Sequence, residues 1–354
     1  MSDDVGDPSC VRPAEPSARE RGIRHVLVCL DRSRLAETCL PHARFIANAF
    51  GARMTLLHVL ASPEGDQPPS RPDALDWELT RREAEQYLAG IQNELGQAGF
   101  SRERVAIEVA QGRPAERIIA AAHALRADLT ILSSHGEGGM GAWNLGSTTQ
   151  QVLALVPGSV LVMPIDFATS PEGSVKRILV AVDGSLRTQS VLPEVAQLAR
   201  FHDAEVLLLH VVPEPKPTAI LADENDLELA RSLASRLRIS AERYLSRLRE
   251  RIFAQIANVE VLVILSPDER RALLEVAAQR HADLLVLAAH GATCDAERPF
   301  GSVTAYALQH GKLPLLVLQD LPSRERDSGR PPAEFSERPP DVRASFHPRA
   351  LEET

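Results

Sequence analysis

Short apolar runs alternate along the chain with longer segments in which apolar residues recur at helical spacing. The run at 24–30 is typical of a strand buried on both faces, and similar runs follow at 53–59, 104–110, 129–132 and 159–163. The helical segments cover Leu35 to Phe50 and residues 75–97, and two more begin after Pro114 and after Ser147. Strands that alternate with helices predict an α/β fold with a parallel sheet and right-handed crossovers.

The whole pattern then occurs a second time. Asp31 and Asp183 are 152 positions apart, and the same offset relates Ser33 to Ser185, Pro41 to Pro193 and His58-Val59 to His210-Val211. After the long helix the offset becomes 155, which relates Asp128 to Asp283, His135-Gly136 to His290-Gly291 and Gly146-Ser147 to Gly301-Ser302. A three-residue insertion before the third strand of the second copy accounts for the change. The repeat predicts two tandem domains of one fold.

We place domain 1 at 23–165 and domain 2 at 176–319, joined by a linker at 166–175. Residues 1–22 are polar and contain proline, and residues 320–354 combine prolines with nearly balanced charges, so we expect both to be disordered. The N-terminal stretch lacks the apolar core of a signal peptide, and no apolar run reaches transmembrane length. We therefore expect a cytoplasmic protein that has no membrane partner.

Composition narrows the classes of partner. The net charge of −9 gives no electrostatic case for DNA or RNA, and the 4% aromatic content argues against a stacking platform for single strands. The Arg-rich run from Arg231 to Arg251 alternates with leucines, which indicates a solvated helix face. The four cysteines form no CxxC pair, and we expect Cys29 and Cys39 to pack in the core.

A glycine-rich loop follows the fourth strand of domain 1. Gly136 opens it, nine residues (137–145) follow, and Gly146-Ser147-Thr148 then begins a helix. Free N–H groups at a helix start, the positive end of the helix dipole and two hydroxyl groups together suit a phosphate. Domain 2 repeats the same spacing between Gly291 and Gly301-Ser302. Two loops of equal spacing, each after an apolar strand, are much stronger support for a ligand site than one.

These features resemble the universal stress protein family in its tandem form. The matching parts are the Asp31 and Asp183 ends of the first strands, the Leu-Leu-His-Val ends of the second strands, and the loop before Gly-Ser. The family's nucleotide signature is a glycine, two residues, a glycine, nine residues, then a glycine and Ser or Thr. Ser133 and Ala288 stand where the first glycine belongs, and both copies keep the rest of the signature.

The resemblance implies two Rossmann-like domains, each with a five-stranded parallel sheet of order 3-2-1-4-5. Ligands bind such sheets at the switch between strands one and four, where Asp31 and His135-Gly136 lie. The resemblance also implies that Asp31 and the backbone of Val59 contact the adenosine part of ATP. It implies that the ribose and the phosphates, accompanied by Mg²⁺, contact five further residues of domain 1. Those residues are Ser133, Gly136, Gly146, Ser147 and Thr148, and the domain 2 counterparts of the site are Asp183, Val211, Gly291, Gly301 and Ser302.

Domain 2 departs from the pattern in ways that disfavour a nucleotide. Its loop at 292–300 lacks glycine and contains Asp295 and Glu297, which would repel phosphate. Asp-x-Ser before a helix is also common capping chemistry, so a purely local role for Asp31 and Asp183 stays open. We expect nucleotide mainly in domain 1.

Three functions remain open at this point. The first is a non-catalytic, ATP-binding stress-response regulator with an unknown protein partner. The second is a weak ATPase or adenylyl-transfer enzyme, although no Lys or Arg lies within 133–148 and no catalytic residue can be assigned. The third is a scaffold that has lost nucleotide binding.

Other motifs in the sequence do not indicate a different site. GxGxxG occurs at 136–141, but it follows the fourth strand and not the first, where a dinucleotide-binding motif belongs. No P-loop is present, and the histidines lack metal-site spacing. The apolar fifth strands, which family members often use to pair, suggest a pseudo-dimer within the chain, and homodimerisation stays open.

Overall fold

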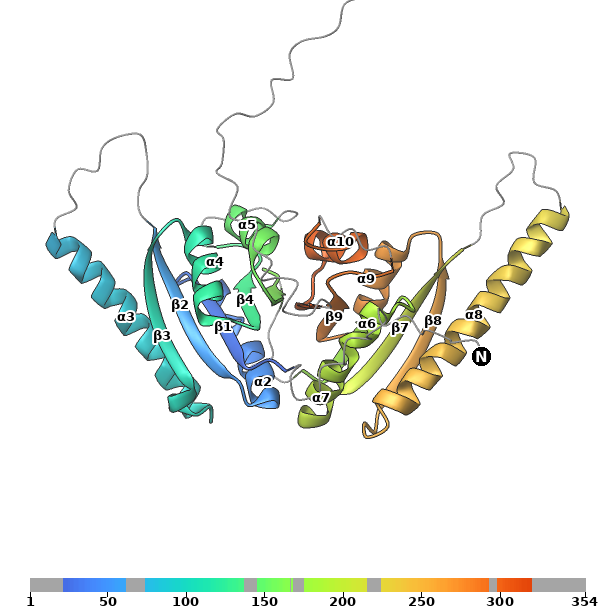
Figure 1. Ribbon diagram of the computed structural model, residues 1–354, viewed down its shortest axis with the longest axis horizontal. Coiled ribbons are helices and arrows are strands. Elements are labelled where there is room, and N and C mark those ends of the chain that lie inside the picture. Colours follow the sequence, from blue (N-terminus) through green and yellow to red (C-terminus); the bar gives the residue numbers. More distant parts are fainter. Residues whose placement is uncertain are drawn as a thin grey trace, which may run out of the picture. The chain divides into compact units, whose positions relative to one another are not determined.

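The computed structural model describes residues 22–61, 74–136, 145–165, 167, 175–214, 224–292 and 298–319. Each domain alternates strands and helices (Figure 1). Domain 1 contains β1 (His25–Leu30), α1 (Arg34–Glu37), α2 (Leu40–Phe50), β2 (Arg53–Ala61), α3 (Ala74–Gln97), the 3₁₀ turn η1 (Arg102–Arg104), β3 (Val105–Gly112), α4 (Pro114–Leu125), β4 (Leu129–Ser133), α5 (Ser147–Leu155) and β5 (Ser159–Met163). Domain 2 contains β6 (Arg177–Ala181), α6 (Leu186–Ser190), α7 (Leu192–His202), β7 (Glu205–Pro213), α8 (Glu224–Ile252), β8 (Val259–Ser266), α9 (Glu269–Gln279), β9 (Leu284–Ala288), α10 (Ser302–His310) and β10 (Leu315–Leu318).

The strands confirm the predicted α/β class. Their order across the sheet is β3-β2-β1-β4-β5-β10-β9-β6-β7-β8, so each domain has the expected 3-2-1-4-5 arrangement. Within each domain the strands are parallel, for example Val28 beside Leu56 on one side and Ile131 on the other. The apolar edge strands β5 and β10 pair antiparallel, with Leu161 opposite Leu316. Each edge strand therefore covers the other.

Both faces are buried along central strands such as β1 and β4, which explains why these strands are almost wholly apolar. Alternate residues of β1 belong to different cores. Val26 and Val28 pack with the cluster on the α2 and α3 side, whereas Leu27 and Cys29 pack with residues of α4. Cys29 and Cys39 are both buried, as expected, and burial raises the pKa of the Cys29 thiol to about 12.

The segment from Leu35 to Phe50 forms two helices, although its apolar spacing predicts one. The reason is Pro41, which lies in the first turn of α2. Proline has no N–H to donate to residue 37, and its ring would clash with that carbonyl in a continuous helix. The chain therefore ends α1 at Glu37 and starts again at Leu40. Pro193 lies in the first turn of α7 and accompanies the same break after α6.

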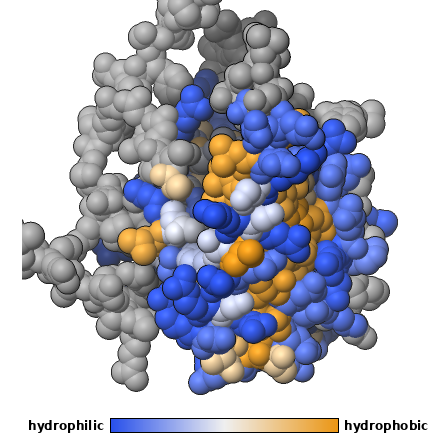
Figure 2. Space-filling model, turned by 90° about the vertical axis from the view of Figure 1, so that its right-hand side faces the viewer, coloured by the Kyte–Doolittle hydropathy of each residue, from blue (hydrophilic) through white to orange (hydrophobic). Residues whose placement is uncertain are grey.

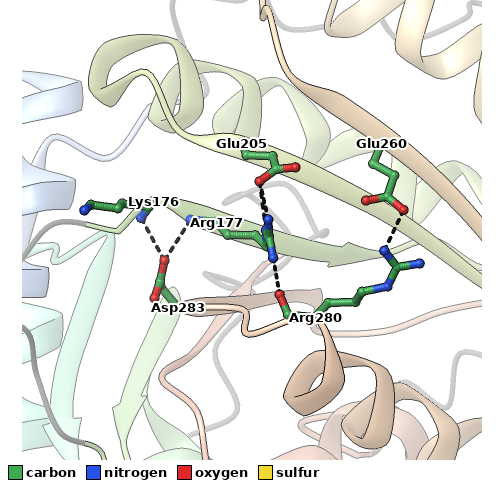
Figure 3. Close-up of polar contacts among 6 residues, drawn as sticks. All are labelled: Lys176, Arg177, Glu205, Glu260, Arg280 and Asp283. Atoms are coloured by element: carbon green, nitrogen blue, oxygen red, sulfur yellow. Dashed lines mark hydrogen bonds and ion pairs between the residues drawn. The ribbon is translucent and has the colours of Figure 1, made fainter.

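An aspartate in each domain holds together the amino ends of two neighbouring strands. In domain 2, Oδ2 of Asp283 accepts hydrogen bonds from the backbone N–H groups of Lys176 (2.9 Å) and Arg177 (2.8 Å), as Figure 3 shows. The Arg177 side chain also donates to the Arg280 carbonyl and pairs with Glu205 at 2.8 Å. In domain 1, Asp128 accepts in the same way from Arg24 and His25. These bonds tie the start of the first strand to the turn before the fourth.

Helix α8 is mostly exposed to solvent, as its arginines predict, and some of its leucines are exposed as well. Only Ala241, Leu245 and Leu248 of this helix are buried. The side of the molecule on which α8 lies shows hydrophobic residues among hydrophilic ones (Figure 2). Leu229 and Leu233 of α8 are exposed. Within the described residues, no helix is long and apolar enough to cross a membrane.

Candidate functional site

A crevice of about 870 Å³ lies in domain 1 at the carboxyl ends of β1, β2 and β4. All seven residues that the sequence proposes for the domain 1 site line it; these are Asp31, Val59, Ser133, Gly136, Gly146, Ser147 and Thr148. They come from three strand ends, the loop after β4 and the start of α5. The parallel sheet brings them together because the carboxyl ends of its strands share one edge.

Asp31 stabilises the turn that leaves β1. Its Oδ1 accepts hydrogen bonds from the Ser33 backbone N–H (3.0 Å) and the Ser33 hydroxyl (2.5 Å). Ser33 in turn caps α1 by accepting from the Ala36 N–H at 3.1 Å. Ser33 is therefore the capping residue, and Asp31 positions Ser33. This local role accounts for one carboxylate oxygen, Oδ1.

Gly136 and Gly146 are needed for close approach of the backbone. A β-carbon on Gly136 would lie 2.8 Å from Asp31 Oδ2. A β-carbon on Gly146 would lie 3.4 Å from both the His135 Cα and the Ser134 carbonyl oxygen. The Gly146 N–H donates to that same carbonyl at 2.8 Å. Glycine at both positions therefore brings the end of β4, the end of β1 and the start of α5 within contact distance.

Helix α5 begins at the crevice. Gly146 is its N-cap, and the first turn consists of Ser147, Thr148 and Thr149, whose backbone N–H groups have no acceptor within the helix. Ser147 is exposed. Thr149 is buried, and its hydroxyl donates to the Ser133 carbonyl at 2.9 Å. Thr149, which sequence reasoning did not single out, therefore fixes the helix start on the end of β4.

Four histidines near the carboxyl ends of the strands make local hydrogen bonds. Nδ1 of His58 lies 2.8 Å from the Leu30 carbonyl oxygen, and Nδ1 of His210 lies 2.5 Å from that of Val182, so the two domains match. His135 Nδ1 is 3.2 Å from the Ser134 hydroxyl, and His290 Nε2 is 2.9 Å from the Arg298 carbonyl. Among the residues the structure describes, no three His, Cys, Asp or Glu side chains are grouped to hold a metal ion.

In domain 2, Asp183 crosses from the end of β6 to the loop after β9. Its Oδ1 accepts from the Ser185 N–H (2.9 Å) and the Thr188 hydroxyl (2.8 Å), and its Oδ2 accepts from the Ala292 N–H (2.6 Å). Burial alone would raise the pKa of this carboxyl, but the hydrogen bonds outweigh burial and lower it. Asp183 is therefore well satisfied within its own domain.

The strand ends and the helix start at the domain 1 crevice differ in polarity from the corresponding positions of domain 2. The repeat offset places Ala288 and Ala289 where domain 1 has Ser133 and Ser134, and Val303 where it has Thr148. Gly301 repeats the Gly146 arrangement, since its N–H donates to the Ala289 carbonyl at 2.8 Å. The backbone is thus kept in domain 2, while three hydroxyl groups are lost.

Arg32 also lines the domain 1 crevice, although the sequence did not indicate it. The glycine-rich loop contains no Lys or Arg within 133–148, and Arg32 lies at the end of a different strand, β1. Its backbone has a φ of 69°, which is uncommon for a residue with a side chain. This backbone conformation is a signal that only the structure reveals.

Together, the fold and the crevice define a tandem of two Rossmann-like domains with a candidate ligand site at the switch point of domain 1. The model of the universal stress protein family matches residues 22–164 and 174–319, and the chain therefore belongs to this family. The domain boundaries that the sequence pattern predicts, 23–165 and 176–319, stay predictions.

Known relatives agree with this assignment. A universal stress protein of Thermus aquaticus, encoded beside a QAH/OAS sulfhydrylase gene, is 33% identical over 139 residues, which are 39% of this chain and 96% of the relative. A universal stress protein of Synechocystis is 24% identical over 84% of this chain and 100% of its own. A crystal structure of a universal stress protein from Archaeoglobus fulgidus has a TM-score of 0.59 at 17% identity and covers 84% of this chain and 98% of its own, which supports the fold alone.

Proposed function

We propose that the chain is a non-catalytic, nucleotide-responsive regulator that binds ATP in the crevice of domain 1. The observation that carries the proposal is that one crevice gathers all seven proposed contacts, from Asp31 to Thr148. Its volume of about 870 Å³ is within the usual range for small-molecule sites. Concave shape, glycine backbone and a helix start at one place are the features expected of a nucleotide site.

In this proposal the ligand runs across the crevice from β2 to α5. Asp31 and the Val59 backbone contact the adenosine part. Gly136, Gly146 and Ser147 hold the ribose and phosphates, with Ser133 and Thr148 as neighbouring hydroxyl groups. The positive end of the α5 dipole favours the phosphate charge. Mg²⁺ accompanies the phosphates, which supply most of its ligands.

Domain 2 is proposed to bind nucleotide much more weakly. Asp183, Val211, Gly291, Gly301 and Ser302 repeat the backbone of the site, but Ala288 and Val303 offer no hydroxyl groups. The acidic residues Asp295 and Glu297 lie outside the described residues, and their repulsion of phosphate stays a prediction.

Regulation requires that ATP binds two states of the protein differently. We propose that the bound nucleotide changes the surface that the chain offers to a protein partner at the segments 61–73 and 137–145. Residues 62–73 and 137–144 lie outside the described part of the chain. The partner is defined here only as a protein that distinguishes the loaded from the empty state.

The decisive experiment is to denature freshly purified protein and identify the released nucleotide by chromatography and mass. About one ATP per chain supports the proposal, whereas two ATP molecules per chain would contradict the weaker nucleotide binding proposed for domain 2. Empty protein would be titrated with ATP and magnesium by calorimetry. Absence of heat at millimolar ATP would favour a scaffold that has lost nucleotide binding, whereas ATP turnover that disappears in Asp31→Ala would favour an enzyme.

A further inference from the structure

Arg32 has a left-handed backbone conformation at a place where no helix ends. Four described residues other than glycine have a positive φ: Arg32, Arg126, Asp203 and His281. Arg126 and Asp203 are the C-caps of α4 and α7, and His281 directly follows the C-cap of α9, so all three lie where helices normally end in the left-handed region. Arg32 instead lies between the end of β1 and the N-cap of α1.

Domain 2 shows what this turn requires. The position that corresponds to Arg32 is occupied by Gly184, with a φ of 88°. Glycine adopts this region without steric cost, whereas a residue with a β-carbon does not. The turn itself therefore needs the left-handed backbone and has no need of an arginine side chain. Strained residues of this kind justify a search for a function of the side chain.

Arg32 offers a cation to the crevice in which the proposed function places a phosphate chain. It lines the crevice together with Gly146 and Ser147. Among the described residues that line this crevice, it carries the one permanent positive charge. Asp31, its neighbour in sequence, adds a carboxylate that a polyanionic ligand must tolerate. A planar guanidinium can offset this charge and donate two hydrogen bonds to one phosphate.

The ion pair that Arg32 makes within the chain is easily exchanged. Its Nη1 lies 3.7 Å from Oε2 of Glu83 on α3, and the two side chains are 43% and 63% exposed. Exposed pairs of this kind contribute little to stability because water and salt screen them. A ligand phosphate can therefore replace Glu83 as the partner of Arg32 at small cost.

We propose that Arg32 makes the domain 1 crevice selective for ligands with a chain of two or more phosphates, and that Glu83 competes with the phosphates for it. The inference rests on the proposed function, since it names the residue that distinguishes ATP from adenosine at the same site. It predicts that the charge of Arg32 contributes to the affinity for ATP and leaves the affinity for adenosine unchanged.

The test compares the full-length wild type with Arg32→Gly, which is the residue that domain 2 uses. We expect Arg32→Gly to lower ATP affinity at least tenfold, to change adenosine affinity less than twofold, and to leave the melting temperature of the empty protein unchanged or raised. Arg126→Gly is the matched control. It removes the same side chain from a positive-φ position at the exposed end of α4 and should leave both affinities unchanged.

Glu83→Gln provides the second arm. It frees Arg32, so we expect a two- to fivefold gain in ATP affinity in the wild-type background and a smaller gain in the Arg32→Gly background. Equal gains in both backgrounds would show that Glu83 acts only as a nearby negative charge. Equal losses of ATP and adenosine affinity in Arg32→Gly, or no loss of either, would overturn the selectivity of Arg32.

Tripolyphosphate separates the failure of this inference from the failure of the proposed function. If the wild type binds tripolyphosphate and Arg32→Gly does not, Arg32 is a polyphosphate contact even when adenosine fails to bind, and only the adenine part of the proposed function is lost. If the wild type binds ATP and Arg32→Gly binds it equally well, the proposed function stands and the inference is wrong. If the wild type binds none of these ligands, both are wrong.

Discussion

A β-carbon on Gly136 would lie 2.8 Å from Oδ2 of Asp31, so the loop after β4 meets the end of β1 at a contact that excludes any side chain. The β-carbons of real residues almost never approach another heavy atom so closely. The carboxylate is also held from the other side, because its Oδ1 accepts the hydroxyl and the N–H of Ser33. A larger residue at 136 must therefore displace Asp31 or push the loop into the crevice.

We accordingly expect Gly136→Val to abolish ATP binding, and Gly136→Ala to weaken it at least tenfold. Calorimetric titration of purified variants measures this. Gly90→Ala on the exposed side of α3 is the control, because nothing lies within 4 Å of the added carbon. Wild-type affinity in Gly136→Val would mean that ATP does not bind in this crevice.

The corresponding change in domain 2, Gly291→Val, should lower the stability of the protein and leave its ATP affinity unchanged. The added carbon in Gly291→Val would press on the Asp183 carboxylate, which three neighbouring residues hold by hydrogen bonds. We expect the variant to unfold at lower denaturant concentration and to keep its ATP affinity. Chemical denaturation and calorimetry on the same sample test both points. Equal loss of ATP binding from Gly136→Val and Gly291→Val would contradict the asymmetry between the domains.

Much of this architecture could be predicted because it depends on local patterns that occur twice. The apolar runs located the strands to within a few residues, and the offsets of 152 and 155 paired each element with its counterpart. The break between α1 and α2 is not evident from the apolar pattern, because the helical spacing of apolar residues continues through Pro41. Proline lies there in the first turn, a position it favours, and the preceding residues still continue the helical spacing.

The candidate site was predictable only in part. Asp31, Gly136 and Gly146 carry recognisable residue types at recognisable spacings. Arg32 does not, because its signals are a backbone angle and a place in the crevice, and both depend on the folded chain. Thr149 was missed for a similar reason. Its hydroxyl reaches the Ser133 carbonyl, a contact between residues 16 positions apart that no periodic pattern marks.

The hydroxyl groups of the domain 1 crevice give a second prediction on affinity. Replacing Ser133 by Ala and Thr148 by Val gives this wall the side chains of domain 2. We expect the double variant to bind ATP about tenfold more weakly, equivalent to about 1.4 kcal/mol, because two polar contacts near the ribose and phosphates are lost. Ser101→Ala, at an exposed position before η1, is the control for loss of a hydroxyl elsewhere. Unchanged ATP affinity in the double variant would mean that residues other than Ser133 and Thr148 cause the proposed difference in ATP affinity between the domains.

His42 should make the protein sensitive to acid. It is buried on α2, and its Nδ1 is without a hydrogen-bond partner in the described part of the chain. Burial lowers the pKa of His42 to about 4, with a small opposing effect of Asp283. The unfolded chain has the ordinary pKa of about 6.5, so between pH 6.5 and 4 it binds more protons than the folded chain. The contribution of His42 to stability is therefore fully present above pH 6.5 and is lost as the pH drops toward 4.

Denaturant titrations at pH 7 and pH 5 measure this loss. We expect His42 to account for a loss of free energy of unfolding on the order of 2 kcal/mol between these pH values, and His42→Leu to remove that part of the loss. His123→Leu is the control, since His123 is exposed on α4. An equal pH dependence in the wild type and His42→Leu would show that other groups determine acid sensitivity.

Asp283 should matter far more for stability than the exposed ion pairs of the same domain. Its Oδ2 accepts two backbone N–H groups, those of Lys176 and Arg177 (Figure 3). Asp283→Ala leaves both donors unpaired at the start of a central strand, and we expect a loss of about 2 kcal/mol in the free energy of unfolding. Glu242→Ala is the comparison, because it removes a 2.9 Å pair with Arg238 whose side chains are 46% and 56% exposed. That pair should contribute less than about 0.5 kcal/mol. Asp283→Asn, which keeps an acceptor oxygen, should recover part of the loss, so equal destabilisation by Ala and Asn would show that the charge matters and the two hydrogen bonds do not.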